Sequence, residues 1–237
     1  MQLLIIRHGD PDYRLDSLTE KGFREASLLA NRLASSGVRD FYVSPLGRAM
    51  DTARPALQRL EKKPVVCDWL QEFPITFPDP RTGETHIIWD YMPAYRAQHP
   101  LWNDKDRWMD DEPFASNNVR PMVEHVFSRL DQLLASYGYI REGDFYRVET
   151  DAPNFDRVAL ICHMGIGLIL LSHLLNIAAP QLLHTAFLPP SSVTTAVTEE
   201  REKGLAQFRC IGIGDTSHLY AAGESISRSG YFEEAQP

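Results

Sequence analysis

Two runs of uninterrupted apolar residues constrain the fold of this 237-residue chain most strongly. Leu3–Ile6 lies almost at the start of the chain, and Val158–Ile161 lies far downstream of it. A strand made only of apolar residues is buried on both faces, which is typical of a parallel sheet covered by helices. The chain is therefore expected to place both strands inside a layered α/β domain.

The rest of the sequence alternates helix and strand signals in the way an α/β fold requires. After residue 118 the apolar spacing predicts an amphipathic helix over 119–134, a helix from about 165 to 175, and antiparallel strands over 193–198 and 205–211. The expected order of the first third is strand 3–6, a helix capped by Ser17 or Thr19 and ended by Gly37, strand 41–43, a helix begun by Ser44-Pro45, and strand 65–67.

Residues 73–118 interrupt this regularity with six prolines and eight aromatic residues. A proline-broken segment of this length is usually a lid or a binding insertion. A small subdomain that packs its aromatic side chains on itself is the other interpretation, and the two are compatible. The polar residues 223–237 are interpreted as a loose tail, and the whole of 1–237 as one domain.

Charge and cysteine content exclude several classes of partner and compartment. The net charge is -8, and residues 73–118 alone carry 4 Lys and Arg against 8 Asp and Glu. No basic face stands out, so we expect neither a nucleic acid nor a membrane as partner. No apolar stretch reaches the ~18 residues of a membrane helix. Three distant cysteines and the absence of a leader pattern favour a cytoplasmic protein.

Two histidines stand directly after the two buried strands. Arg7-His8-Gly9 follows the first strand, and Cys162-His163 ends the second. In open α/β sheets, ligands bind outside the carboxyl ends of the strands, so both histidines can face one pocket. Arg48 lies in the first turn of a predicted helix, where free backbone N–H groups and partial positive charge favour an anion. A single histidine at a strand end is usually structural, and a single arginine on a helix is usually solvated. Because His8, His163 and Arg48 all follow strand ends, a shared functional site is favoured.

Phosphoryl transfer to an imidazole is the chemistry that fits this set. A neutral histidine has a nucleophilic ring nitrogen near pH 7, and Arg7 and Arg48 offer forked donors to phosphate oxygens. The leaving alkoxide then needs a proton, for which Glu72 after the third strand is the candidate. The spacing alone favours an ordinary surface glutamate at this position.

Several segments in order resemble the histidine phosphatase superfamily, the phosphoglycerate-mutase-like enzymes. They cover residues 1–72 closely and 158–175 again, and Asp215–Leu219 resembles the C-terminal segment of that family. The matching segments are Arg7-His8-Gly9, Leu18–Gly22, Ser44–Ala53, Leu70-Gln71-Glu72 and Cys162-His163.

The resemblance implies a three-layer α/β/α sandwich with a mostly parallel mixed sheet and a large lid insertion at 73–118. It implies a phosphohistidine intermediate on His8 and a proton donor at Glu72. It also implies a phosphate pocket of Arg7, Arg48 and His163. The substrate would be a phosphorylated small molecule, and neither a metal nor a cofactor is implied.

Three departures from the family pattern bear on the reaction. Met164 stands where many members carry Gly, Arg14 where mutase-like members often carry Asn, and Asp10 where many carry Glu or Gln. We expect Met164 and Arg14 to contribute to substrate binding. The insertion is acidic, whereas mutases carry basic residues there, which favours a phosphatase over a mutase.

Two other functions stay open at this point. One is a phosphoglycerate-mutase-type phosphotransferase, and the other is a catalytically idle protein that binds a phosphorylated ligand. A magnesium-dependent aspartyl phosphatase would need its first aspartate directly after the strand, where Arg7-His8-Gly9 stands before Asp10 instead. The sequence also leaves a homodimer open.

Overall fold

The computed structural model describes residues 1–73, 76–78, 83, 85–150 and 152–231. Their main sheet has eight strands in the order β5-β4-β10-β1-β11-β12-β9-β8. The first four are mutually parallel and the remaining pairs are antiparallel. In that order the strands are Val65–Val66, Asp40–Val43, Arg157–Cys162, Gln2–Arg7, Val193–Glu202, Leu205–Asp215, Phe145–Val148 and Tyr139–Glu142.

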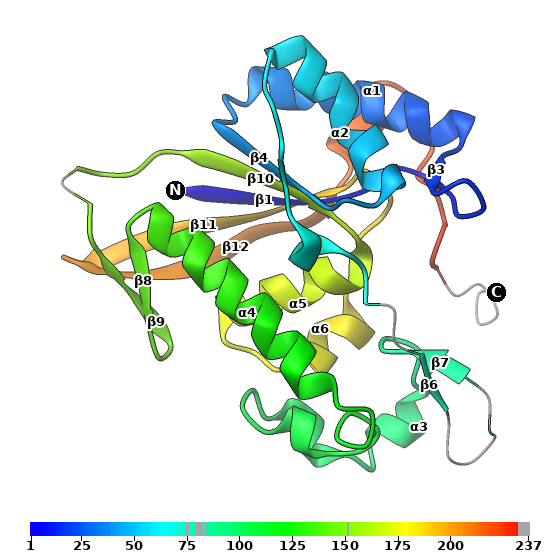
Figure 1. Ribbon diagram of the computed structural model, residues 1–237, viewed down its shortest axis with the longest axis vertical. Coiled ribbons are helices and arrows are strands. Elements are labelled where there is room, and N and C mark those ends of the chain that lie inside the picture. Colours follow the sequence, from blue (N-terminus) through cyan, green and yellow to red (C-terminus); the bar gives the residue numbers. More distant parts are fainter. Residues whose placement is uncertain (74–75, 79–82, 84, 151, 232–237) are drawn as a thin grey trace.

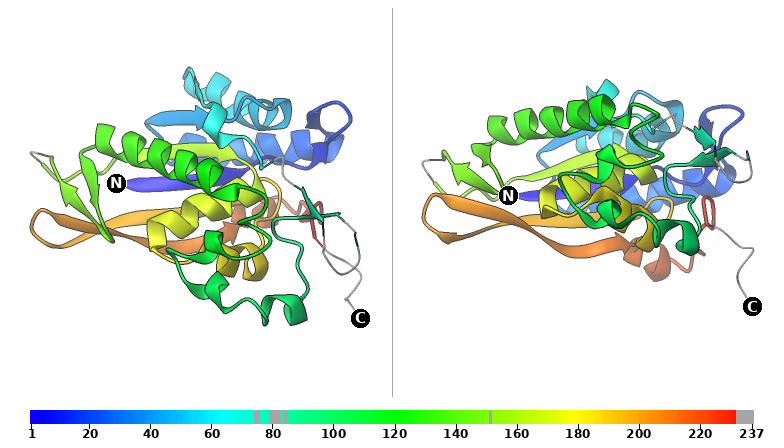
Figure 2. Two further views of the ribbon diagram at one scale, coloured as in Figure 1. Left: turned by 60° about the horizontal axis from the view of Figure 1, so that its bottom comes forward. Right: turned by 90° about the horizontal axis from the view of Figure 1, so that it is seen from below.

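Helices cover both faces of this sheet and make three layers (Figures 1 and 2). Helices α1 (Glu20–Ser35) and α2 (Gly47–Leu60) lie on one face. Helices α4 (Val119–Ser136), α5 (Met164–Leu175) and α6 (Ala179–Thr185) lie on the other face. The expected α/β/α sandwich with a mixed sheet is confirmed.

The alternation of side chains along the central strands divides the core in two. Leu4 and Ile6 of β1 pack with α1 and α2, whereas Leu3 and Ile5 pack with α4 and α5. All four side chains are buried, as the continuous apolar run predicts for a strand covered on both faces. Burial of this kind holds the backbone of β1 in place up to Arg7, where the polar segment Arg7-His8-Gly9 begins.

The parallel half of the sheet brings the two histidine segments to one edge. Strand β1 pairs with β10 so that Arg7 lies opposite Cys162, and β10 pairs with β4 up to Val43. The residues that follow these three strands therefore emerge side by side. These are His8, His163 and Ser44, and α2 and α5 begin next to them.

The insertion folds around its own aromatic side chains. The Phe114 ring contacts Phe77, Tyr91, Trp102 and Trp108, with centroids 4.7 to 6.4 Å apart. These side chains belong to the same core cluster as Leu3 and Ile5 of β1, so the insertion also packs onto the domain, and both the lid and the subdomain interpretation stay predictions. The insertion contains β6 (Thr76–Pro78), β7 (Thr85–Ile87), α3 (Pro93–Arg96) and short 3₁₀ helices at Pro100–Asn103 and Trp108–Asp110.

The helix caps and the small elements agree only in part with the sequence prediction. Thr19 caps α1 by accepting a bond from the Gly22 N–H, as expected. Helix α2 begins at Gly47 after Leu46 and has no side-chain cap, so the expected cap at Ser44 is wrong; its hydroxyl contacts His163 instead. The hairpin β8–β9 and helix α6 were not expected. Small elements are β2 (Pro11–Asp12), β3 (Ser17–Leu18), a 3₁₀ turn at Asp68–Leu70 and α7 (Ser217–Ala221).

The described part of the C-terminal segment lies against the domain. Glu224 pairs with Lys21 and Arg24 of α1, and the Ser229 carbonyl accepts a bond from Arg7. Residues 232–237 lie outside the described part of the chain. None of the described helices combines the length and apolar character that crossing a membrane requires.

Candidate active site

His8 stands at the end of β1 with its ring held in one tautomer. Its Nδ1 lies 2.7 Å from the Gly9 carbonyl oxygen, and since a carbonyl only accepts, Nδ1 carries the proton. The lone pair is then on Nε2. Burial and the charge of Arg7 lower the pKa of His8 to about 3, so the ring is neutral at physiological pH. A neutral imidazole with a free Nε2 lone pair is a nucleophile.

The turn after His8 is tied to the second helix. The Gly9 N–H donates to the Thr52 hydroxyl at 2.9 Å, and that hydroxyl donates to the Arg48 carbonyl at 2.7 Å. A Cβ at Gly9 would lie 2.9 Å from the Gly22 carbonyl oxygen, so the close approach of α1 favours glycine there. The nucleophile and Arg48 are therefore held in one hydrogen-bonded unit.

His163 lies beside His8 with ring centroids 5.0 Å apart. Its Nε2 is 2.9 Å from the Ser44 hydroxyl, which accepts from the Leu46 N–H at 3.3 Å and can donate its own proton to the ring. In the tautomer in which Ser44 donates to Nε2, the ring proton is on Nδ1. Burial, with His8 and both arginines nearby, lowers the pKa of His163 far below its usual range.

Arg7 is buried and held by main-chain carbonyls from the far end of the chain. Nη1 donates to Leu188 at 2.7 Å and Nη2 donates to Ser229 at 2.9 Å. The guanidinium also lies 5.6 Å from the Phe187 ring centroid. These contacts fix the plane of the group before any ligand binds.

Arg48 in the first turn of α2 pairs with Asp16. Its Nη1 is 2.6 Å from one Asp16 oxygen, and the other oxygen accepts from the Gly47 N–H at 2.7 Å. Asp16 thus satisfies a free donor at the start of the helix while orienting the arginine. The Tyr13 ring lies over the guanidinium at 5.4 Å.

Three buried nitrogens around His8 have no hydrogen-bond partner among the described residues. They are Arg7 Nε, Arg48 Nε and His163 Nδ1. A buried donor without a partner costs about 1–3 kcal/mol, so an oxyanion that accepts from all three would be stabilised here. We call Arg7, His8, Arg48 and His163 the anion cradle.

Glu72 lies next to the start of α5 and accepts three backbone bonds. The Gly165 N–H donates to Oε2 at 3.0 Å, and the N–H groups of Ile166 and Phe73 donate to Oε1 at 2.9 and 3.1 Å. Burial raises the pKa of Glu72, partly opposed by these bonds and by the charge of Arg7. Glu72 is therefore not an isolated surface glutamate. It is a carboxyl group whose burial favours the protonated form.

The two remaining predicted site residues differ in position. Met164 is buried, and its sulfur lies 3.8 Å from Arg7 Nη1, so it forms part of the cradle wall. Arg14 is exposed in the loop after β2, and its described bond is made by its backbone N–H to Asp12. The structure does not bring its side chain into the cradle. Its role toward substrate stays a prediction.

Comparison with known proteins identifies the family. The profile of the histidine phosphatase superfamily (branch 1) matches residues 3–210. The chain belongs to this superfamily. The matched residues include the four cradle residues and Glu72.

A short stretch of the chain also resembles a mutase. It is 38% identical over 61 residues to a 2,3-bisphosphoglycerate-dependent phosphoglycerate mutase from Thermoplasma acidophilum. The aligned stretch spans 30% of the mutase and 22% of this chain. The whole mutase activity therefore does not transfer with it.

Solved structures of similar fold include several phosphatases. A phosphoserine phosphatase from Entamoeba histolytica in complex with phosphoserine has a TM-score of 0.59 at 19% identity, covering 92% of this chain and 98% of its own. A mycobacterial glucosyl-3-phosphoglycerate phosphatase has a TM-score of 0.59 at 20% identity, covering 91% and 99%. At this identity the likeness establishes the fold.

Sequence reasoning missed the residues that hold the cradle in place. Ser44, Asp16 and Thr52 orient His163, Arg48 and the turn after His8, respectively. Ser44 and Thr52 lie inside the family-like segment, but nothing local shows which partner each contacts. Among the described residues, no three His, Cys, Asp or Glu side chains are grouped to hold a metal ion.

Proposed function

We propose that the protein is a metal-independent phosphomonoester hydrolase that forms a phosphohistidine on His8, with Glu72 as proton donor. The observation that carries the proposal is the His8 tautomer. Nδ1 donates to the Gly9 carbonyl, which leaves the Nε2 lone pair for attack beside three unpartnered donors. No other described histidine combines that tautomer with the guanidinium groups of Arg7 and Arg48 as neighbours.

In the first step, Nε2 of His8 attacks phosphorus and the bond from phosphorus to the ester oxygen breaks. Charge develops on the non-bridging oxygens, where Arg7, Arg48 and the Nδ1–H of His163 donate to them. The departing alkoxide takes the proton that Glu72 holds. The products of this step are the alcohol and phosphohistidine, with Glu72 ionised.

In the second step, water attacks the phosphohistidine. The Glu72 carboxylate accepts a proton from that water, the bond between Nε2 and phosphorus breaks, and inorganic phosphate leaves. His8 returns to its neutral form, and Glu72 again holds its proton. One carboxyl thus acts first as acid and then as base.

Hydrolysis is favoured over phosphoglycerate isomerisation by the charge of the insertion. Residues 73–118 carry 4 Lys and Arg against 8 Asp and Glu, so they offer little to hold a second anionic group of a substrate. The short mutase-like stretch keeps the isomerase as the second candidate. Conversion of 3-phosphoglycerate into its 2-isomer with added bisphosphoglycerate would favour that candidate.

The test measures phosphate release from a panel of phosphomonoesters with and without EDTA, for the wild type and for His8→Ala. We expect activity that EDTA leaves unchanged and that His8→Ala lowers by more than a thousandfold. Rapid quenching at alkaline pH should trap an acid-labile phosphoryl group on the wild type, because phosphohistidine is stable in base.

His99→Gln is a matched control, since it removes another imidazole, one that pairs with Asp111 in the insertion. We expect it to keep wild-type turnover. Loss of activity in EDTA, or full activity in His8→Ala, would refute the mechanism. A folded wild type that hydrolyses no ester but binds phosphate would identify a binding protein.

A further inference from the structure

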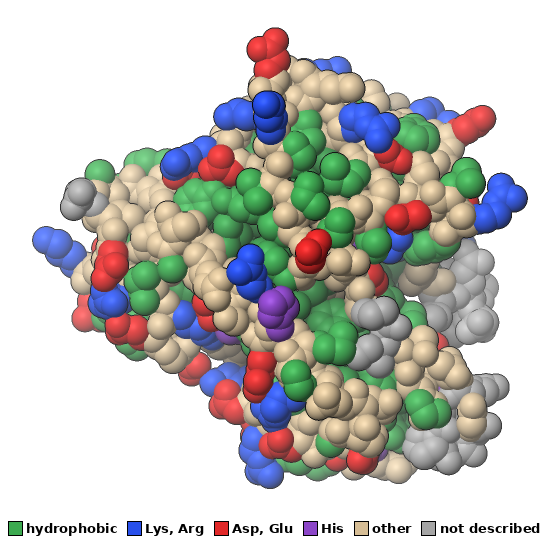
Figure 3. All heavy atoms as spheres, viewed as in Figure 1, with side chains coloured by type: hydrophobic (Ala, Val, Ile, Leu, Met, Phe, Trp, Pro, Cys, Tyr) green, Lys and Arg blue, Asp and Glu red, His purple; other side chains and the backbone are tan. Residues whose placement is uncertain are grey.

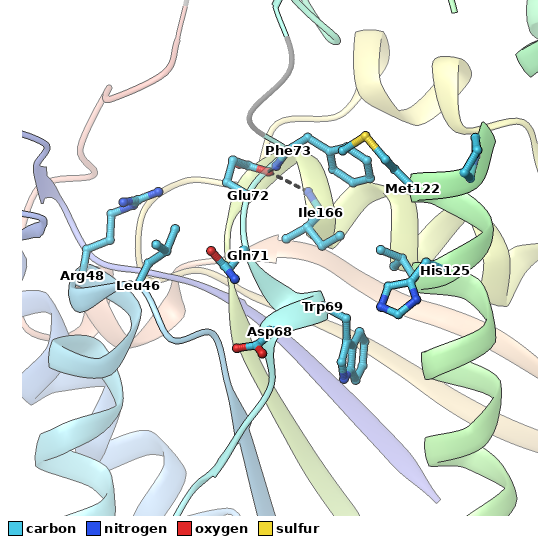
Figure 4. A pocket seen from close by; sticks show the side chains of 12 residues that line it. Leu46, Arg48, Asp68, Trp69, Gln71, Glu72, Phe73, Met122, His125 and Ile166 are labelled. Carbon is cyan, nitrogen blue, oxygen red and sulfur yellow. Dashed lines mark hydrogen bonds between the residues drawn. The ribbon is translucent and has the colours of Figure 1, made fainter. Parts of the chain in front are cut away.

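A large hollow begins beside two residues of the proposed chemistry. It has a volume of about 710 Å³, and both Arg48 and Glu72 line it. Figure 4 shows Arg48 and Leu46 at one side and Met122 and His125 at the other, with the segment from Asp68 to Phe73 passing between them in this view. The oxygen that leaves phosphorus must be near Glu72, so the group attached to that oxygen can extend into this hollow.

The wall of the hollow away from the cradle is mostly apolar, although the exposed imidazole of His125 on α4 also lines it. Helix α4 contributes Met122 and Val126, and helix α5 contributes Ile166. Trp69 and Phe73, both buried, complete the wall from the segment after β5. Hydrophobic side chains are gathered on this face between α2 and α4 (Figure 3). Apolar surface of this kind binds apolar groups in proportion to the area removed from water.

The described lining of the hollow offers no Lys or Arg that is free to bind a second anionic group. Among its described lining residues the charged side chains are Arg48, Asp68 and Glu72. Arg48 is already paired with Asp16 and belongs to the anion cradle, and Glu72 is the proton donor. A carboxylate on the substrate would therefore meet Asp68 and no free Lys or Arg, and the other ionisable side chain described in the lining is the imidazole of His125. An uncharged apolar group would meet matching surface.

We propose that the natural substrate is a phosphomonoester of an apolar alcohol, whose hydrocarbon part occupies this hollow. The inference rests on the proposed function and adds the class of alcohol to it. The Leu46, Met122 and Val126 side chains select the substrate by hydrophobic contact. Phosphoserine and 3-phosphoglycerate, with charged groups close to the ester, are poor substrates.

The experiment compares kcat/KM for ethyl, butyl and hexyl phosphate, which share one leaving-group chemistry and differ only in chain length. Each methylene that enters the hollow should raise kcat/KM by about two- to fourfold, chiefly through KM. Phosphoserine should be a poorer substrate than ethyl phosphate. Butyl and hexyl phosphonate, tested as competitive inhibitors of the wild type, should show the same dependence on chain length.

Met122→Gln keeps the length of the side chain and the helix propensity of α4, and it should flatten the dependence on chain length. Glu124→Gln is the matched control, because Glu124 is exposed on α4 and does not line the hollow; it should keep the wild-type dependence. The phosphonate series on the wild type stays decisive if Met122→Gln fails to fold.

Equal kcat/KM for all three alkyl esters would overturn the inference and leave the hydrolase intact. No turnover of any ester would instead overturn the hydrolase, and the inference with it. A dimer seen by sedimentation that Met122→Gln dissociates, together with no dependence on chain length, would assign the hollow to a second copy of the chain and refute the substrate class.

Discussion

Replacing Glu25 by glutamine should change how the stability of the protein depends on pH. Glu25 on α1 is 0% exposed and supports the turn after His8, because its Oε2 accepts from the Asp10 N–H at 2.8 Å. Its Oε1 has no hydrogen-bond partner among the described residues, and Lys21 Nζ is 3.8 Å away. Burial raises the pKa of Glu25 from 4.5 to about 7.

The sign of the effect follows from proton binding. Between pH 4.5 and about 7 the folded protein keeps a proton on Glu25 that the unfolded chain has lost. The stability that this group contributes is therefore fully present below pH 4.5. It is lost as the pH rises through the pKa of Glu25 in the folded protein. At ~1.4 kcal/mol per pKa unit, the loss amounts to about 3 kcal/mol.

The assay is urea unfolding of the wild type and of Glu25→Gln at closely spaced pH values from acid to mild alkali. Groups common to both proteins cancel in the difference between the two free energies of unfolding. That difference should rise by about 3 kcal/mol in favour of Glu25→Gln across the interval. A constant offset from the buried amide is independent of pH and does not affect the result.

Glu20→Gln is the control, because Glu20 lies on the same helix and is exposed. The free energy of unfolding of Glu20→Gln should stay within about 0.5 kcal/mol of the wild-type value at every pH. A flat difference for Glu25→Gln would refute the reasoning, since it would mean that Glu25 has the same pKa in the folded and the unfolded protein. A difference that falls with pH would reverse the assigned direction of the pKa change.

Three further predictions follow from particular contacts. Gly47→Ala should lower the free energy of unfolding by about 1–3 kcal/mol, because its Cβ would lie 2.0 Å from the Asp16 carbonyl oxygen. Gly212→Ala, where a Cβ meets nothing within 4 Å, should change it by less than ~0.5 kcal/mol in the same urea titration. Trp108→Ala should cost about 3–5 kcal/mol in thermal unfolding, because this side chain is only 1% exposed in the aromatic cluster of the insertion; an unchanged melting temperature would contradict that packing. The kcat/KM for ester hydrolysis should fall as pH rises through the raised pKa of Glu72, and Glu72→Gln should lower it by about 10²- to 10⁴-fold and remove that limb; a rate that is flat from acid to alkali would assign the proton to another group.

Local sequence patterns were sufficient for the central elements of the fold. The continuous apolar runs at Leu3–Ile6 and Val158–Ile161 predicted strands buried on both faces, and β1 and β10 are such strands. Because parallel strands end at one edge, the same patterns predict that His8 and His163 lie together. The hairpin β8–β9 was missed because Tyr139–Glu142 and Phe145–Val148 mix apolar and charged residues without clear alternation.

The burial and the protonation of the site residues depend instead on contacts between segments far apart in the chain. Glu72 accepts from Gly165 and Ile166, more than 90 residues away, and Arg7 donates to a carbonyl 222 residues away. Periodicity and propensity describe neighbours within a few residues, so they indicated where strands and helices begin and which reactive groups follow them. Burial, tautomer and proton affinity arise only when distant segments exclude water around one group, and that exclusion requires the packed fold.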